Sequence, residues 1–166
     1  VIRGDPDDDA TWDKLWSEVM DRVWDSPHGL MRVMACCVDS GGHSTQKVYE
    51  VCNTREARSK KLLAIKGSKD RRAPVWNAEF RPGKGKKHLR FYFVGTQAAK
   101  DVIYKRLGMK ESGPGYMHYP PGRAAEHPEY FRTLVSNVKR RVKDAEGHWV
   151  RVWQLPEGRH DEALDC

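Results

Sequence analysis

The sequence lacks several features that would place the chain in a special class of protein. No apolar run approaches the length of a bilayer-spanning helix, which excludes a helical membrane segment in this sequence. The few cysteines show neither a CxxC pair nor the spacing of a disulfide framework, so we expect reduced core thiols instead of zinc ligands or disulfides. No internal repeat or low-complexity tract is present. The cysteines concerned are Cys36, Cys37, Cys52 and Cys166.

The composition is that of a basic globular protein. Hydrophobic residues make up 39% of the 166 residues and charged residues 32%, and we expect a single domain over residues 1–166 with a real core. The formal net charge is +7 and the pI about 9.3. A basic surface attracts polyphosphates and releases counterions when it binds them, so the balance favours an anionic partner.

The first part of the chain predicts a helix, a buried strand and a strand–helix–strand crossover. Acids at 5–9 suit the start of a helix that residues 26–29 end. Residues 30–38 form an apolar run with little alternation, which is typical of a strand covered on both faces. Ser44 or Thr45 can cap the next helix, and 62–65 predicts the parallel strand after it. The first helix has an apolar stripe of Trp12, Leu15, Trp16, Val19 and Val23.

The second part predicts another strand and helix, followed by a hairpin. Residues 89–94 form the strand, and Gly108 stops the helix. A turn at 114–115 leads into a short strand at 116–119, and a helix covers 129–136. Residues 138–142 and 149–153 then predict an antiparallel hairpin with basic and aromatic faces. The helix after 89–94 turns Ala99, Val102, Ile103 and Leu107 inward.

A basic loop is predicted at 67–88, between the two strand–helix units. It is long for a compact domain, which favours a functional segment. Cations interleaved with Trp76 and Phe80 suit a contact that tracks a nucleic-acid backbone. The alternative is a solvated loop whose charges contact nothing, and Lys66 equally suits a side chain that only extends from the sheet edge. The expected DNA-binding residues are Lys66, Lys69, Arg71, Arg72, Lys84, Lys86 and Lys87.

Carboxylates follow the strand at 30–38 and close the chain. In open α/β sheets, sites lie beyond the carboxyl ends of strands, where Asp39 is expected, and Gly41 and Gly42 let the backbone approach a ligand. Asp161 and Asp165 are four residues apart and would share one face of a helix. Each group also has a plainer interpretation, a strand-exit turn for the first and a helix start with favourable acids for the second. Divalent metal ions prefer such oxygen ligands.

Six motifs in this order closely resemble the nuclease domain of the large terminase subunit of lambda-type tailed phages, along the whole chain. They are DSGG at 39–42, AIKGS at 64–68, VGT at 94–96 with AKD at 99–101 and Tyr104, GPGYMHYP at 113–120, YFRTL at 130–134, and EALDC at 162–166. The resemblance implies an RNase H-like α/β fold with a central mixed sheet flanked by helices, and a metal-dependent endonuclease that cuts concatemeric double-stranded DNA. The family's ATPase is not expected in this sequence, which has no GxxxxGK[ST] loop.

The resemblance also implies the catalytic residues and partners. Asp39 and Asp165 match two of the family's three carboxylates, and Asp161 is a further candidate where relatives tend to carry asparagine. Asp39 and Asp165 would hold two Mg²⁺ or Mn²⁺ ions, as in two-metal phosphodiester hydrolysis. The first family carboxylate and the body of the last helix find no match, so we expect a fold that is incomplete at both ends. Implied partners are double-stranded phage DNA, the small terminase subunit and the portal of the procapsid, in the host bacterial cytoplasm.

Other functions remain open on the sequence alone. A non-catalytic module that binds DNA or docks on the packaging motor would need only the basic charge. A structural part of the packaging complex would bind DNA weakly. A resolvase or transposase with an RNase H-like fold is a nearer alternative, against which the ordered GPGYMHYP and EALDC motifs argue. We expect Lys100 to face solvent on its helix.

Overall fold

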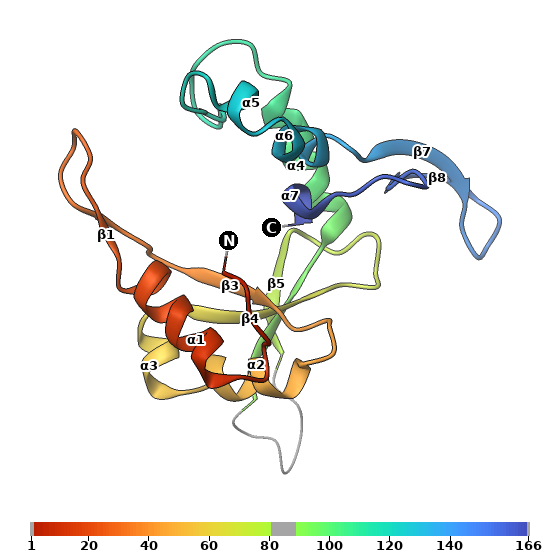
Figure 1. The fold of residues 1–166 in the computed structure, drawn as a ribbon. Coiled ribbons are helices and arrows are strands. Elements are labelled where there is room, and N and C mark those ends of the chain that lie inside the picture. Colours follow the sequence, from red (N-terminus) through yellow and green to blue (C-terminus); the bar gives the residue numbers. More distant parts are fainter. Residues whose placement is uncertain (1, 81–88, 166) are drawn as a thin grey trace. The chain divides into compact units, whose positions relative to one another are not determined.

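The computed structural model describes residues 2–80 and 89–165, and the chain forms two compact units (Figure 1). Unit 1 consists of Val1–Lys69 and Trp76–Val94, and unit 2 of Asp70–Val75 and Gly95–Cys166. Asp39 therefore belongs to unit 1, whereas the acids at 161–165 belong to unit 2. The single domain over 1–166 stays a prediction.

Unit 1 contains a mixed four-stranded sheet, which confirms the predicted α/β class. The strands are β3 (Cys36–Asp39), β4 (Leu62–Gly67), β5 (Trp76–Phe80) and β6 (Phe91–Val94). Their order is β3-β4-β6-β5, with β3, β4 and β6 parallel and β5 antiparallel to β6. The segment expected as a basic loop, 67–88, thus contains β5, and its residues 81–88 lie outside the described residues.

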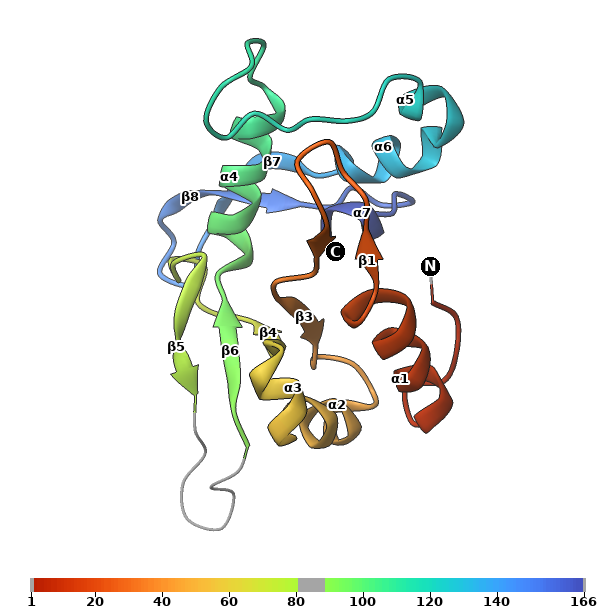
Figure 2. The same ribbon diagram turned by 90° about the vertical axis from the view of Figure 1, so that its left-hand side faces the viewer.

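The predicted crossover joins β3 to β4 through two helices, α2 (Thr45–Cys52) and α3 (Arg55–Ser59). Both helices pack against β4, and Figure 2 shows them side by side. Side chains alternate along a strand, so Leu62 and Ala64 face the helices and are buried, while Leu63 and Ile65 face the other side and are half-buried. The core of unit 1 consists of Trp12, Met20, Val48, Tyr49, Cys52, Ala57, Leu62, Ala64 and Phe91.

The N-terminal helix ends earlier than the apolar stripe suggests. Helix α1 (Asp9–Leu15), capped by the Asp8 side chain, continues into a π-helical turn, η1 (Trp16–Met20). The expected last stripe residue, Val23, instead lies in β1 (Val23–Trp24), which pairs with β2 (Met31–Arg32) as a separate antiparallel ribbon. The expected buried strand over 30–38 is therefore wrong, since β2 is exposed and only β3 joins the main sheet.

The cysteines only partly follow the expectation of core thiols. Cys52 is buried, Cys36 is half-buried and Cys37 is exposed, and all three are free thiols. Burial raises the pKa of Cys52 to about 12. The core expectation is wrong for Cys37, because alternation along β3 turns it away from the helices. Cys166 lies outside the described residues.

Unit 2 carries the predicted helices and hairpin. Helix α4 (Thr96–Leu107) is followed by α5 (Arg123–Glu126) and α6 (Pro128–Leu134), then by the antiparallel strands β7 (Val138–Lys143) and β8 (Trp149–Gln154), and by the short α7 (Glu162–Asp165).

One prediction for unit 2 is wrong, and another holds only in part. The segment 116–119 is not a strand, although the turn before it forms, with the Tyr116 amide 3.0 Å from the Gly113 carbonyl. The expected inward stripe of α4 holds only in part, since Ala99, Ile103 and Leu107 are half-buried and Val102 is exposed. Among the described residues, no helix is long and apolar enough to cross a bilayer.

Candidate functional site

Asp39 lies where the sequence predicts a site, at the carboxyl end of β3. Beyond it the chain leaves the sheet and returns as α2. Its register partner on β4 is Ile65, so its side chain projects on the same face as Leu63 and Ile65, away from the helices. The side chain is exposed. A carboxylate there is accessible to a ligand from solvent.

One oxygen of the Asp39 carboxylate is held by the turn that follows. The Gly41 amide donates to Asp39 Oδ1 at 2.9 Å, which orients the side chain over the turn. A Cβ at Gly41 would stand 3.2 Å from Oδ1 and 3.3 Å from Oδ2. At Gly42 a Cβ would meet nothing within 4 Å. Gly41 therefore keeps space around the carboxylate, and Oδ2 accepts no hydrogen bond within the described residues.

The backbone next to Asp39 is held by the hydroxyl groups of Ser40 and Thr45. The Ser40 hydroxyl is fully buried and donates to the Ile65 carbonyl at 2.8 Å, and the Ser40 amide reaches the same carbonyl at 2.8 Å. The Thr45 hydroxyl lies 2.7 Å from the Ser40 carbonyl and 2.8 Å from that of Gly42. These bonds tie the turn to β4 and to the start of α2. Asp39 thus projects from a rigid base.

Lys66, a predicted DNA-binding residue of unit 1, does not share the sheet face of Asp39. Lys66 lies on β4 one residue beyond the partner of Asp39, so alternation turns it to the opposite face, beside Phe93 of β6. Lys69 in unit 1 and Arg71 and Arg72 in unit 2 are exposed. A DNA contact by these residues stays a prediction. Lys84, Lys86 and Lys87 lie outside the described residues.

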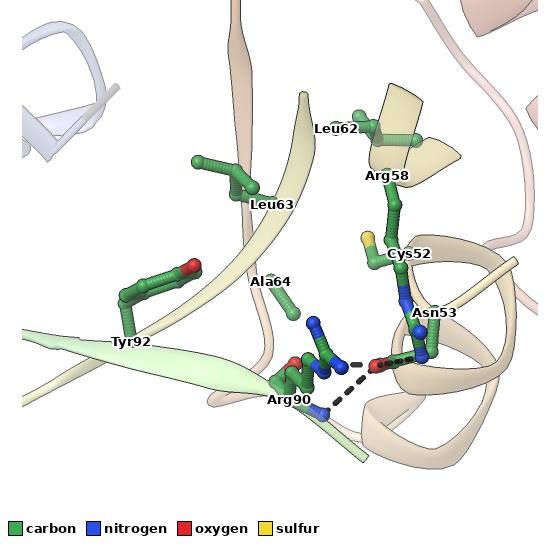
Figure 3. A pocket seen from close by; sticks show the side chains of 8 residues that line it. All are labelled: Cys52, Asn53, Arg58, Leu62, Leu63, Ala64, Arg90 and Tyr92. Carbon is green, nitrogen blue, oxygen red and sulfur yellow. Dashed lines mark hydrogen bonds between the residues drawn. The ribbon is translucent and has the colours of Figure 1, made fainter. Parts of the chain in front are cut away.

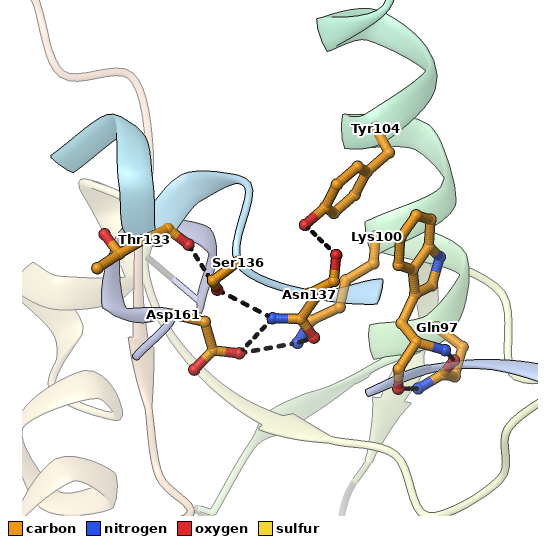
Figure 4. A network of polar contacts seen from close by, with 8 residues as sticks. Gln97, Lys100, Tyr104, Thr133, Ser136, Asn137 and Asp161 are labelled. Atoms are coloured by element: carbon orange, nitrogen blue, oxygen red, sulfur yellow. Dashed lines mark hydrogen bonds and ion pairs between the residues drawn. The ribbon is translucent and has the colours of Figure 1, made fainter. Parts of the chain in front are cut away.

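Asp161 of unit 2 occupies a closed polar network (Figure 4). Its Oδ2 accepts from the Asn137 amide group at 2.8 Å and from the Lys100 ammonium at 3.3 Å. The Asp161 and Lys100 side chains are only 16% and 15% exposed. The ammonium also reaches Asn137 Oδ1 at 3.0 Å, and the Tyr104 hydroxyl donates to the Asn137 carbonyl at 3.0 Å. A charged pair at this depth is stabilised only when it is also hydrogen-bonded, and Asp161 Oδ2 accepts two such bonds.

Sequence reasoning missed Lys100 and Asn137. Lys100 was expected to face solvent, which is wrong, because its partners lie 37 and 61 residues away and no local pattern reveals them. One signal was available, since Lys100 and Tyr104 are four residues apart and share a face of α4. Gln97 extends that face, and its amide exchanges two hydrogen bonds with the Trp153 backbone. Helix α4 therefore docks within unit 2 through polar side chains.

The network fixes the start of the last helix. The Asp161 carbonyl accepts from the Leu164 amide at 2.8 Å in the first turn of α7, and Leu164 is buried. Asp165 is the last residue of α7, and its side chain lies outside the described part of the structure. His160 is highly exposed and stands 3.4 Å from Glu162. His160 is thus apart from the buried network.

The two described carboxylates differ as metal ligands. Asp39 has an accessible oxygen and no cation beside it among the described residues, so it fits a hard divalent ion. Asp161 already shares Oδ2 between an ammonium and an amide, and an ion at that oxygen would have to displace Lys100. The geometry favours a positioning role for Asp161.

Two other features lie apart from these carboxylates. A cavity of about 140 Å³ in unit 1 lies at the amino ends of β4 and β6, and Asn53 joins Arg58 and Arg90 there (Figure 3). It is at the wrong edge of the parallel strands for an α/β active site.

At the tip of the β7–β8 hairpin, ligand atoms of Asp144, Glu146 and His148 lie within 4.8 Å of one another. Asp144 Oδ1 already accepts the amides of Glu146 and His148, at 3.1 and 2.8 Å. These bonds are those of a side chain that orders a tight turn.

The chain belongs to the family of terminase nuclease domains. Residues 1–166 match the family described as terminase large subunit gpA, endonuclease domain. This confirms the resemblance and supports a nuclease role in DNA packaging. No curated protein and no solved structure gives a significant match.

Proposed function

We propose that this chain is the metal-dependent part of a packaging terminase that cuts concatemeric double-stranded viral DNA, with an RNase H-like site. The observation that carries the proposal is Asp39, an exposed strand-end carboxylate on a rigid turn, in a chain of the terminase endonuclease family. Mg²⁺ or Mn²⁺ would be the metal, held by Asp39 and Asp165. The small terminase subunit and the portal would be partners, in the bacterial host's cytoplasm.

In this proposal some residues of the chain bind the metal ions, and others position the residues that bind them. Bound divalent ions neutralise charge on the phosphodiester oxygens and acidify a water molecule. The Gly41 amide restricts the Asp39 carboxylate to one orientation, which lowers the entropy that ligand binding must remove. Asp161, held by Lys100 and Asn137, anchors the first turn of α7 and so orients the segment that carries Asp165.

Nicking of supercoiled plasmid tests the proposal. The chain should nick in Mn²⁺ or Mg²⁺ and not in EDTA. Asp39→Asn should reduce the rate at least about a hundredfold, because a metal ligand stabilises the transition state by several kcal/mol. The same variant should lose Mn²⁺ binding measured by titration calorimetry, and Asp165→Asn should behave alike.

Asp13→Asn is the matched control, since Asp13 is an exposed carboxylate on α1 of the same unit. It should nick and bind Mn²⁺ as the parent does. Nicking by Asp39→Asn at the parental rate would remove Asp39 from the site. DNA binding without nicking in any metal, and without Mn²⁺ binding, would favour a non-catalytic DNA-binding module or motor-docking part.

A further inference from the structure

The β7–β8 hairpin of unit 2 presents a face that combines cations with tryptophan. Directly opposed residues of an antiparallel pair project on the same side. The register pairs Lys139 with Trp153, Arg141 with Arg151, and Lys143 with Trp149. The basic face, as we call it, consists of Lys139, Arg141, Lys143, Trp149, Arg151 and Trp153.

The cations of the basic face lie over the rings. The Arg141 guanidinium is 4.9 Å from the Trp149 ring centroid and the Lys143 ammonium 5.4 Å, while Lys139 lies 5.5 Å from Trp153. Such contacts orient long side chains that would otherwise be free. Trp149 nevertheless remains 56% exposed. The face therefore holds an accessible aromatic ring with two ordered cations beside it.

The two ends of the basic face differ. At the Trp153 end the face is occupied, since Tyr104 of α4 stacks on Trp153 at 4.0 Å and Lys139 pairs with Asp101. The hydrogen bond from Lys139, followed by that from Trp153, holds the pKa of Asp101 below its usual range. At the Trp149 end the face is open, and its three cations are exposed: Arg141, Lys143 and Arg151.

The stability of the hairpin does not explain why cations gather at the open end of the basic face. Arg141 stands directly opposite Arg151, and like charges in opposed positions destabilise a strand pair. Within the described residues neither forms an ion pair. From 138 to 154 the hairpin carries five lysines and arginines against the two acids Asp144 and Glu146, both in the turn.

The other face of this hairpin carries its aliphatic side chains. Val152 is buried, and Val142 and Val150 are half-buried. Arg140 also belongs to that face, opposite Val152, and is itself exposed. The chain thus offers an arginine on each side of the same strand, one residue apart.

We propose that the basic face binds the sugar–phosphate backbone of DNA and holds the strand while it is cut. Alternate residues of a strand are about 6.8 Å apart, a separation close to that of consecutive phosphates along one strand. Arg141, Lys143 and Arg151 neutralise phosphates, and Trp149 supplies a ring for a sugar or an unstacked base. The proposal rests on the proposed nuclease function and adds a DNA-binding surface outside the predicted segment 67–88.

Fluorescence anisotropy in EDTA tests the basic face without requiring cleavage. The probes are a labelled 30-base-pair duplex and a single strand of the same sequence, each titrated over a salt series. Arg141→Ala combined with Arg151→Ala should weaken binding to both probes at least about tenfold at low salt, and should reduce the slope of log K against log salt by about 2. Arg140→Ala is the matched control and should bind as the parent does.

Trp149→Ala distinguishes the two forms of DNA. Loss of a stacked base weakens single-strand binding about five- to a hundredfold, whereas a duplex with stacked bases loses less. A loss confined to the single strand identifies an unpaired segment as the ligand of Trp149. An equal loss on both probes identifies contact with the backbone alone.

Equal effects of the double variant and Arg140→Ala, or an unchanged salt slope, would overturn the proposal, provided that circular dichroism shows folded protein. Arg141→Lys keeps the charge and should retain most of the affinity, which separates lost charge from a damaged hairpin. Metal-dependent nicking, with DNA binding unchanged in the basic-face variants, would support the proposed function and overturn the role of the basic face. Salt-dependent DNA binding that the double variant weakens, without nicking, would support the basic face and contradict the proposed nuclease function.

Discussion

Asp39 and Asp161 are the same residue type in opposite settings. Asp39 is exposed at a strand end, with one oxygen fixed by a backbone amide. Asp161 is mostly buried, with one oxygen shared between an ammonium and an amide. The difference shows how environment assigns a carboxylate its work, because an accessible oxygen can bind an ion while a satisfied one holds the fold. Motif position alone does not distinguish them.

The largest expected effect that separates the two carboxylates is on stability. Asp161→Asn should lower the free energy of unfolding by about 1–3 kcal/mol, since it leaves the Lys100 ammonium partly buried beside a neutral amide. Asp39→Asn should change it by less than about 0.5 kcal/mol, as exposed substitutions usually do. Urea denaturation measures both values.

A double-mutant cycle identifies the source of that loss. If the Lys100–Asp161 pair causes it, Lys100→Met combined with Asp161→Asn should cost less than the two single changes added together. Strict additivity would contradict a direct interaction. If Asp161→Asn had the stability of the parent, Asp161 would not stabilise the fold more than Asp39 does.

The sequence predicts those parts of the fold that depend on local patterns. The crossover from β3 to β4 follows from a helical stripe between two apolar strands, and the β7–β8 hairpin follows from alternation around a turn. The prediction of a single strand over 30–38 is wrong because an apolar run does not reveal where one strand partner gives way to another. Residues 31–32 pair locally with β1, and only 36–39 pair with β4.

The candidate site divides in the same way. Asp39 could be predicted because a strand end and a glycine turn are adjacent in sequence. The partners of Asp161 could not, because Lys100 and Asn137 reach it from elements 61 and 24 residues away. Val102 illustrates the same limit, since it is exposed while α4 makes hydrogen bonds through Gln97 and Tyr104.

A smaller change sharpens the assignment of Asp39 without removing the carboxylate. Gly41→Ala places a Cβ 3.2 Å from Oδ1, so the side chain must move by a few tenths of an ångström. Misplacement on this scale should slow metal-dependent nicking about tenfold. Gly42→Ala is the matched control, since its Cβ meets nothing within 4 Å. Equal rates for the two variants would show that the orientation of Asp39 is unimportant.

The smallest expected effect concerns the support of the Asp161 network by Tyr104. Tyr104→Phe keeps the ring on Trp153 and removes the hydroxyl that donates to the Asn137 carbonyl. The loss of one such hydrogen bond should cost about 1 kcal/mol, measured by urea denaturation. Tyr130→Phe is the control, because Tyr130 is exposed and should tolerate the change.

The pH dependence of stability distinguishes the Tyr104 hydroxyl from a packing defect. Burial raises the pKa of Tyr104 above its usual value of 10.0. The unfolded chain therefore releases the proton first, and stability present below pH 10.0 is lost as the pH rises through the folded-state pKa. Tyr104→Phe should flatten this alkaline decline, whereas Tyr130→Phe should not. An alkaline decline of parental steepness in Tyr104→Phe would show that the buried Tyr104 hydroxyl does not cause it.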